Sequence, residues 1–415
     1  MTTHMKNPDP ASLRQRDRRT PDQIRSDWQF LTAWLRGEVD EPTLLPRQLE
    51  LLFCHHVCGL ASLPDCAGLG WEAVARQKKN QALFAFCAQA VFEKIAHRCR
   101  TRGFSILPVK GISLALTLYA TDPGRRQLSD IDLLVLPDDL PRLATVLEEL
   151  GYRPKKPQML KPAYQKHKGK AEFVTQTPGL PPIDVHTAFI VKKFMARHSG
   201  MPLGTVFSRA RQIQGQQKPL AVLDPVDEWL YLAYHFCLHH RFAGLKWLDD
   251  LQQARLQLRE GDGPTLFQRA QEAGLTPVLT ATVDLLDRVY GPAPQPWRPF
   301  PPWPQSRLTH IWLEDAFLPA KLVARELEHG HGTLTDRLSA FFWEFLFIGE
   351  ARQRRTALLR LLFPGKELLS TIIGPHSWPA YLLFAPLTTC ILTVLTSAFL
   401  LVSLLRCDQS SSPSR

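Results

Sequence analysis

The chain has 415 residues, which is more than one compact core of ordinary size needs and predicts two or three structural units. A composition that is 45% hydrophobic and 21% charged excludes a largely disordered protein, because it holds enough apolar material to offset the entropy of ordering. The net charge of +11 favours an anionic partner, and charge alone leaves nucleotide, nucleic acid and lipid headgroup open.

Residues 1–27 are polar and broken by prolines, so a mobile N-terminus is expected. Apolar residues then recur at three- and four-residue steps, which predicts an N-terminal helical region over residues 28–103 with a turn at 68–70. The eight cysteines have no framework spacing and no apolar leader precedes them, so reduced thiols in the cytoplasm are expected. Cys54 and Cys58 would share a helix face beside two histidines, which suggests either zinc or ordinary buried residues.

From Phe104 onward, predicted strands and helices follow one another. A short apolar run over residues 106–109 predicts a strand, followed by a turn at Lys110-Gly111 and a helix. Residues 131–135 predict a second strand, residues 139–150 an amphipathic helix that ends at Gly151, and residues 172–175 and 183–186 two more strands. The pattern predicts a small mixed-sheet α/β (α+β) domain over residues 104–222.

Helical patterns return over residues 223–290 and, beyond a proline-rich connector at 291–304, over residues 305–370. No Asp, Glu, Lys or Arg occurs between Glu367 and Arg406, and the apolar stretch within 378–405 is long enough to cross a bilayer. Basic residues concentrate before this stretch, so a single C-terminal membrane anchor would leave residues 1–370 in the cytoplasm. The alternative is a buried C-terminal helix or an oligomer contact.

Asp130 and Asp132 are two residues apart, which would place both carboxylates on one face of a strand. Such a pair suits a divalent metal, although a lone Asp-x-Asp more often caps a turn. Lys110-Gly111 lies at a strand-to-helix turn of the kind that binds phosphate, and Asp184 adds a third carboxylate on another predicted strand. Together these residues indicate metal-assisted phosphoryl or nucleotidyl transfer.

The stretch LPVKGISLALTLYATDPGRRQLSDIDLLVLPDDLPRLATVLEELGY, followed by IDVH, resembles the uncharacterised nucleotidyltransferase family of the DNA polymerase beta-like superfamily. The resemblance implies that Gly111 and Ser113 form the glycine turn, that Asp130 and Asp132 are the metal pair, and that Asp184 is the third acid. The superfamily commonly has Gly-Gly or Gly-Ser at this turn, so Lys110-Gly111 departs from its pattern. The resemblance covers about residues 104–253.

The implied reaction is in-line attack by an acceptor hydroxyl on the α-phosphate of a nucleoside triphosphate. Mg²⁺ or Mn²⁺ would be held by Asp130 and Asp132, and Asp184 would ligate a second metal and activate the hydroxyl. Six residues are expected to contact phosphate or substrate: Lys110, Gly111, Ser113, Arg126, His186 and His235. The acceptor, whether protein, glycan intermediate or RNA, is left open.

Two further features admit more than one interpretation. The basic stretch at residues 153–170 would either overhang the site or form a solvated loop. His235, His239 and His240 would bind metal, contact substrate or simply be buried. The alternative to an enzyme is a catalytically inactive nucleotide-binding adaptor, or an accessory protein of envelope polysaccharide assembly.

Overall fold

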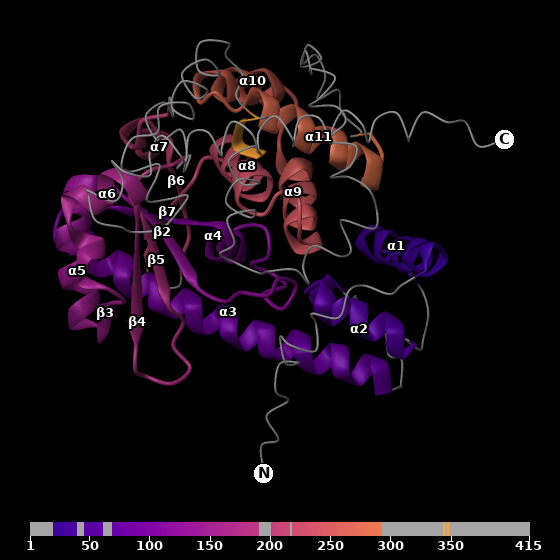
Figure 1. Cartoon of the computed structure of the whole chain (residues 1–415). Coiled ribbons are helices and arrows are strands. Elements are labelled where there is room, and N and C mark those ends of the chain that lie inside the picture. The colour runs from indigo at the N-terminus through magenta and orange to yellow at the C-terminus, as the bar shows by residue number, and fades with distance from the viewer. Residues whose placement is uncertain are drawn as a thin grey trace, which may run out of the picture.

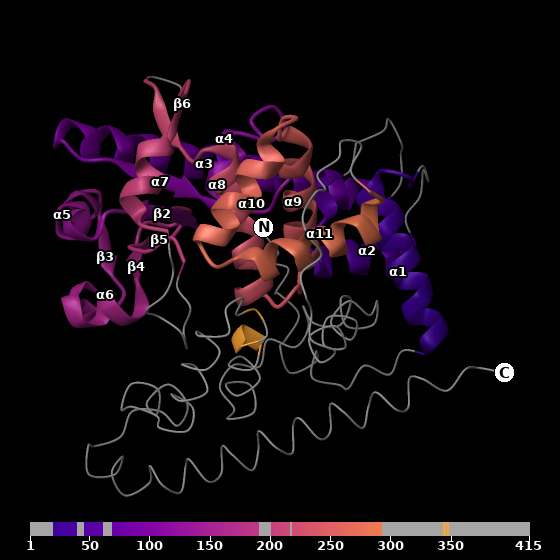
Figure 2. The same cartoon turned by 90° about the horizontal axis from the view of Figure 1, so that it is seen from above.

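The computed structural model describes residues 20–39, 45–60, 69–190, 201–215, 218–292, 343–345 and 347. Its N-terminal helices are α1 (Pro21–Arg36), α2 (Pro46–Cys54) and α3 (Leu69–Thr101). Figures 1 and 2 show the long α3 running from the neighbourhood of α1 and α2 to the strands. The N-terminal part of the chain therefore supports the sheet directly.

Two expectations about the N-terminal region need correction. Helix α1 already begins at Pro21, because Thr20 caps it and exchanges hydrogen bonds with Gln23, so residues 21–27 are helical rather than a mobile end. The turn expected at residues 68–70 is also wrong in part, since Leu69 and Gly70 form the first turn of α3.

A five-stranded mixed sheet follows, with the strand order β1-β2-β5-β4-β3. Its strands are β1 (Ile106–Val109), β2 (Ile131–Val135), β3 (Tyr152–Pro154), β4 (Lys170–Thr175) and β5 (Ile183–His186). Strands β2 and β5 are parallel, and every other pair in the sheet is antiparallel. The connecting helices are α4 (Lys110–Leu116), α5 (Leu140–Glu149) and α6 (Pro162–Lys168). The mixed α/β class and the strands at 106–109, 131–135 and 183–186 are confirmed.

The two faces of this sheet enter different cores. Ile131, Leu133 and Val135 point to one face and pack with residues of α3 and α5. Leu134 points to the other face, which belongs to a larger cluster that includes the helices after the sheet. Because side chains alternate along a strand, Asp132 shares the face of Leu134. The acids therefore lie between the sheet and the helical region.

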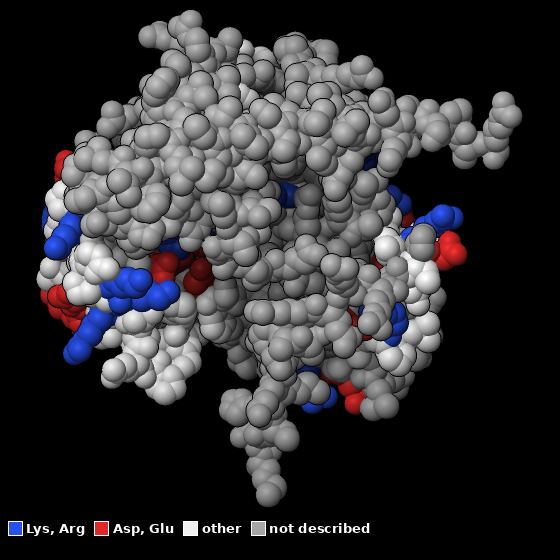
Figure 3. Space-filling view, viewed as in Figure 1, with Lys and Arg blue, Asp and Glu red and all other residues white. Residues whose placement is uncertain are grey.

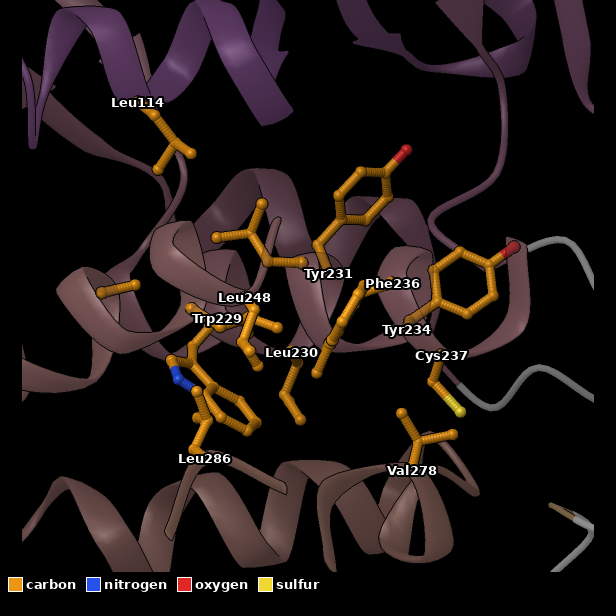
Figure 4. Packing of buried hydrophobic residues seen from close by; sticks show 14 of the residues in the cluster. Leu114, Trp229, Leu230, Tyr231, Tyr234, Phe236, Cys237, Leu248, Val278 and Leu286 are labelled. Carbon is orange, nitrogen blue, oxygen red and sulfur yellow. The ribbon is translucent and has the colours of Figure 1, made fainter. Parts of the chain in front are cut away.

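That helical region begins after α7 (Leu203–Arg209) and a hairpin of β6 (Arg211–Ile213) and β7 (Leu220–Val222). It consists of α8 (Pro225–Tyr234), α9 (Leu245–Gln257), α10 (Asp262–Glu272) and α11 (Thr276–Tyr290). Asp224 caps α8 by accepting a hydrogen bond from the backbone of Val226, and a π-helical turn at His235–His239 continues the helix. Figure 4 shows the apolar side chains of α8 packed in the centre of this region.

The predicted proline-rich connector and the predicted membrane anchor lie outside the described residues, apart from Gly291 and Pro292 at the start of the connector. Of the predicted C-terminal helices, residues 343–345 and 347 are described, and Trp343 packs against Phe242 while its indole N–H donates to the Cys237 carbonyl at 2.6 Å. Within the described part of the chain, no helix is both long enough and apolar enough to cross a bilayer.

Candidate active site

Asp132 and Asp184 lie side by side on the two parallel strands in the middle of the sheet. The register pairs Asp132 with Asp184 across β2 and β5, and His186 follows two residues later on the same face. Ligand atoms of these three side chains lie within 4.8 Å of one another. Two carboxylates and an imidazole form a donor set that fits a divalent cation, so the residues fit the metal that the resemblance implies.

Three cationic or potentially cationic groups contact these acids. The Lys110 ammonium lies 2.7 Å from Oδ1 of Asp132, and Nε2 of His186 lies 2.8 Å from the same oxygen. The Lys170 ammonium lies 2.7 Å from Oδ2 of Asp184. Figure 3 shows acidic atoms set back in a recess beside Lys and Arg atoms, at the level where Figure 1 draws β4 and β5. The acid site is therefore charge-compensated by the protein itself.

These neighbours control the charges of the site. Burial alone would raise the pKa of Asp132, but Lys110 and His186 more than offset burial and hold that pKa well below its usual range. Burial, together with the charge of Lys110, lowers the pKa of His186, so the imidazole is neutral and donates to Asp132. Asp132 is thus an anion, ready to bind a metal cation.

Lys110 reaches Asp132 from a left-handed backbone conformation with φ of 55° at the start of α4. Non-glycine residues rarely adopt this conformation, which costs about 1–2 kcal/mol. The superfamily that the sequence resembles commonly has Gly-Gly or Gly-Ser at this turn. This chain therefore uses the glycine-type backbone but adds an ammonium group to the acid site.

Asp130 lies at a bend just before β2 rather than on the strand, and it is not part of the three-residue cluster. Its carboxylate accepts a hydrogen bond from Ser129 at 3.0 Å. Burial and the nearby charge of Asp132 raise the pKa of Asp130, which places it beside the cluster. The strand thus begins one residue after Asp130, and the shared face of Asp130 and Asp132 stays a prediction.

Gly111, Ser113 and Arg126 are used for packing beside the site. A Cβ on Gly111 would meet Nη1 of Arg126 at 2.4 Å, so the glycine makes room for the guanidinium. Arg126 is buried and its Nε donates to Asp250 at 2.7 Å. The Ser113 hydroxyl donates to the buried carboxyl of Glu228. The structure does not bring Ser113 or the paired guanidinium of Arg126 into the cluster of acids.

His235 lies near Lys110 and His186, at the start of the π-helical turn. Burial, with the charge of Lys110, lowers its pKa well below the usual value, and its Nε2 lies 2.9 Å from Nε2 of His240. His240 in turn stacks on Trp247 with ring centroids 3.6 Å apart. A neutral histidine backed by stacked rings is suited to hydrogen bonding with a substrate.

The two other metal sites considered from the sequence, at the cysteines and at the histidines, are not supported by the structure. Among the residues that the structure describes, Asp132, Asp184 and His186 form the group with metal-ligand geometry, and neither Cys54 with Cys58 nor the three histidines of residues 235–240 form another. Burial raises the pKa of the Cys58 thiol to about 12, as expected for a residue of an apolar core.

From the sequence, Lys170 was included in the basic stretch at residues 153–170, without an assigned partner, and Tyr231 was not identified. Lys170 pairs with His186 across β4 and β5, and alternation along β4 puts Lys170 and Glu172 on the polar face, a pattern that the sequence does contain. Tyr231 belongs to an apolar helix face and carries no comparable signal. Its closeness to the acids depends on how α8 packs on the sheet.

Asp132 on one strand and Asp184 on the next parallel strand, beside a turn that opens a helix, form the arrangement expected of a nucleotidyltransferase domain. Residues 48–291, more than half of the chain, match the family described as uncharacterised nucleotidyltransferase, and the chain belongs to this family. Comparisons with curated proteins and with solved structures gave no match. Membership implies a transferase whose substrate is a nucleoside triphosphate.

Proposed function

We propose that the protein transfers a nucleoside monophosphate group from a nucleoside triphosphate to a hydroxyl acceptor with the help of Mg²⁺ or Mn²⁺. The observation that carries this proposal is the cluster of Asp132, Asp184 and His186 on adjacent parallel strands. Family membership supports the same class of reaction. Asp130 lies beside the cluster and would add a third carboxylate near the metal.

A divalent cation bound to the carboxylates would neutralise the phosphates and polarise the reacting phosphorus. Lys110 and Lys170 then leave Asp132 and Asp184 and contact phosphate oxygens, since each ammonium can exchange one anionic partner for another. The acceptor oxygen bonds to the α-phosphorus, the bond to pyrophosphate breaks, and the hydroxyl proton passes to Asp184. His235, near Lys110 and His186, binds the substrate as a neutral group.

The test is a panel of nucleoside triphosphates labelled at the α-phosphate, incubated with the protein, Mg²⁺ or Mn²⁺ and a membrane extract. Label transferred to protein, RNA or a lipid-linked glycan would identify the acceptor. Asp132→Asn should abolish transfer and weaken Mn²⁺ binding at least tenfold, because the cluster loses an anionic ligand. Asp138→Asn, at an exposed acid just beyond β2, is the matched control and should leave both unchanged. Transfer by the Asp132 variant at the wild-type rate would contradict the proposal.

One observation favours the alternative of a nucleotide-binding adaptor without catalysis. Lys110 and Lys170 already compensate both acids, so the site is stable electrostatically without a metal. An adaptor would bind triphosphate by titration calorimetry but release no pyrophosphate with any acceptor. A role as an accessory protein of envelope polysaccharide assembly would show the same binding together with retention of a glycan intermediate.

We further propose that the chain acts at the cytoplasmic face of a membrane, held by its C-terminal apolar segment. The support is the sequence of residues 378–405 and the basic residues that precede it. Truncation after Pro375 should move the protein from the membrane pellet to the soluble fraction without detergent. Continued sedimentation of the truncated protein with membranes would contradict the anchor.

A further inference from the structure

Tyr231 lies in the wall of the site that faces the sheet. Its ring is almost fully buried on α8, with 3% exposed, and packs 5.0 Å from the ring of Phe189, which follows β5 three residues after His186. Figure 4 shows its hydroxyl pointing away from Val278 and Leu286, at the opposite edge of the apolar cluster. The ring thus packs in the core of the helical region, and the hydroxyl points out of that core.

The charged groups that act on this hydroxyl are the acids of the site. Burial raises the pKa of Tyr231 well above its usual value, and the nearby carboxylates of Asp132 and Asp184 raise it further. A phenol is protonated at neutral pH because its ordinary pKa is about 10, so Tyr231 offers a hydrogen-bond donor near the place where metal and phosphate would be held.

The hydroxyl of Tyr231 makes no hydrogen bond to the described residues and keeps some access to solvent, since it is not among the buried polar atoms that lack a partner, whereas fully buried phenols normally find a protein partner. Three other buried tyrosines do so: Tyr119 donates to Asp250 at 2.9 Å, Tyr152 to the Pro181 carbonyl at 3.1 Å, and Tyr234 lies 2.9 Å from Nε2 of His239. The Tyr290 hydroxyl also lacks a partner, but its charged neighbours are Asp249 and Arg125, away from the cluster. A solvent-accessible donor that makes no hydrogen bond to the described protein, close to an acid site, is available to a ligand that supplies the acceptor.

We propose that Tyr231 is a substrate-binding residue whose hydroxyl donates a hydrogen bond to a phosphate oxygen of the bound nucleoside triphosphate. This assignment rests on the proposed function and adds a contact from α8, opposite the strands that hold the acids. An anionic oxygen is the acceptor that suits it, because a metal-bound phosphate is the group that the neighbouring carboxylates attract into this space. The contact also orients the phosphate relative to the sheet.

The test compares the full-length wild type with Tyr231→Phe, which removes the hydroxyl alone. Titration calorimetry with ATP, GTP, CTP and UTP in the presence of MnCl₂ should show affinity for the preferred triphosphate about tenfold weaker in the variant. Affinity for the corresponding nucleoside, which has no phosphate, should not change. The thermal unfolding midpoint should be unchanged or higher, because the hydroxyl makes no hydrogen bond within the described protein.

Tyr164→Phe, the same change on α6, is the matched control and should bind like the wild type. Equal triphosphate affinity of Tyr231→Phe and a binding-competent wild type would overturn the assignment and leave the proposed function standing. A lowered unfolding midpoint with unchanged affinity would show a structural role instead. Failure of the wild type to bind any of the four triphosphates would overturn the proposed function and this contact with it.

Discussion

Lys110 combines a left-handed backbone with an ammonium group that lies against the principal acid of the site. The backbone with φ of 55° suits glycine, whereas the ion pair with Asp132 requires a long cationic side chain. Strain of this kind persists where the surrounding structure and the function both need it. Lys110 is therefore better explained by its charge than by its local backbone preference.

Two substitutions of Lys110 separate strain from charge. Lys110→Gly and Lys110→Ala both remove the ammonium, so both should weaken triphosphate binding by about tenfold. Only glycine relieves the left-handed conformation, so the glycine variant should be more stable than the alanine variant by about 1 kcal/mol in urea unfolding. Equal stability of the two variants would contradict the strain, and unchanged binding would contradict the phosphate contact.

At the scale of elements, the segment before β2 is held by buried ion pairs to α9. Arg126 donates to Asp250 at 2.7 Å, and Arg125 lies 3.2 Å from Asp249. A Cβ on Gly59 would come 2.1 Å from the Arg125 carbonyl, so the N-terminal region packs closely against the same segment. The position of Asp130 and the start of β2 therefore depend on helices far away in the sequence.

A double-mutant cycle on Arg126 and Asp250 tests this coupling. Each alanine substitution leaves an uncompensated buried charge and should destabilise the fold by about 3–5 kcal/mol. The double variant should cost less than the sum, with an interaction energy of about 1–3 kcal/mol in denaturant unfolding. Alanine at the exposed Arg288 of the Arg288–Asp284 pair should cost less than about 1 kcal/mol. Strict additivity of the two buried substitutions would contradict the coupling.

The elements themselves could be predicted to different extents. A continuous apolar run identified β1, whose four residues are all buried, whereas β2 and β5 were identified from apolar residues that flank Asp132 in β2 and alternate with Asp184 and His186 in β5. Strand β3 and the hairpin of β6 and β7 have three residues per strand, too few for alternation to be read. The start of α1 was missed because a capping box, rather than apolar periodicity, determines it.

The site shows the same limit at the scale of the whole molecule. The sequence contains Asp132, Asp184 and His186 as short motifs, but they are neighbours because β2 and β5 pair in parallel. The two strands that lie between them in the sequence, β3 and β4, are on the far side of β5 in the sheet. Nothing local distinguishes Arg126, which pairs with Asp250, from a residue that binds phosphate. Contacts between the sheet and the helical region, such as those of Tyr231, arise only from tertiary packing.

Buried acids at the junction of the two regions should make the stability of the whole chain depend on pH. Burial raises the pKa of Glu228 to about 7, although its hydrogen bond from Ser113 opposes the shift. The folded state therefore binds a proton that the unfolded chain releases near the usual value of 4.5. The associated stability is present below that value and is lost as pH rises to 7.

Glu228→Gln keeps the shape and a hydrogen-bond acceptor for Ser113 but does not titrate. Between pH 4.5 and pH 7.5 the wild type should therefore lose about 3 kcal/mol of unfolding free energy relative to this variant, as measured by urea unfolding at each pH. Asp249, whose pKa burial raises to about 6, titrates in both proteins, so the difference isolates Glu228. Glu148→Gln, at an exposed position of α5, should follow the wild-type curve. Parallel curves for wild type and Glu228→Gln would mean that the junction tolerates the ionised carboxylate, and that the sheet and the helical region are held together without this proton.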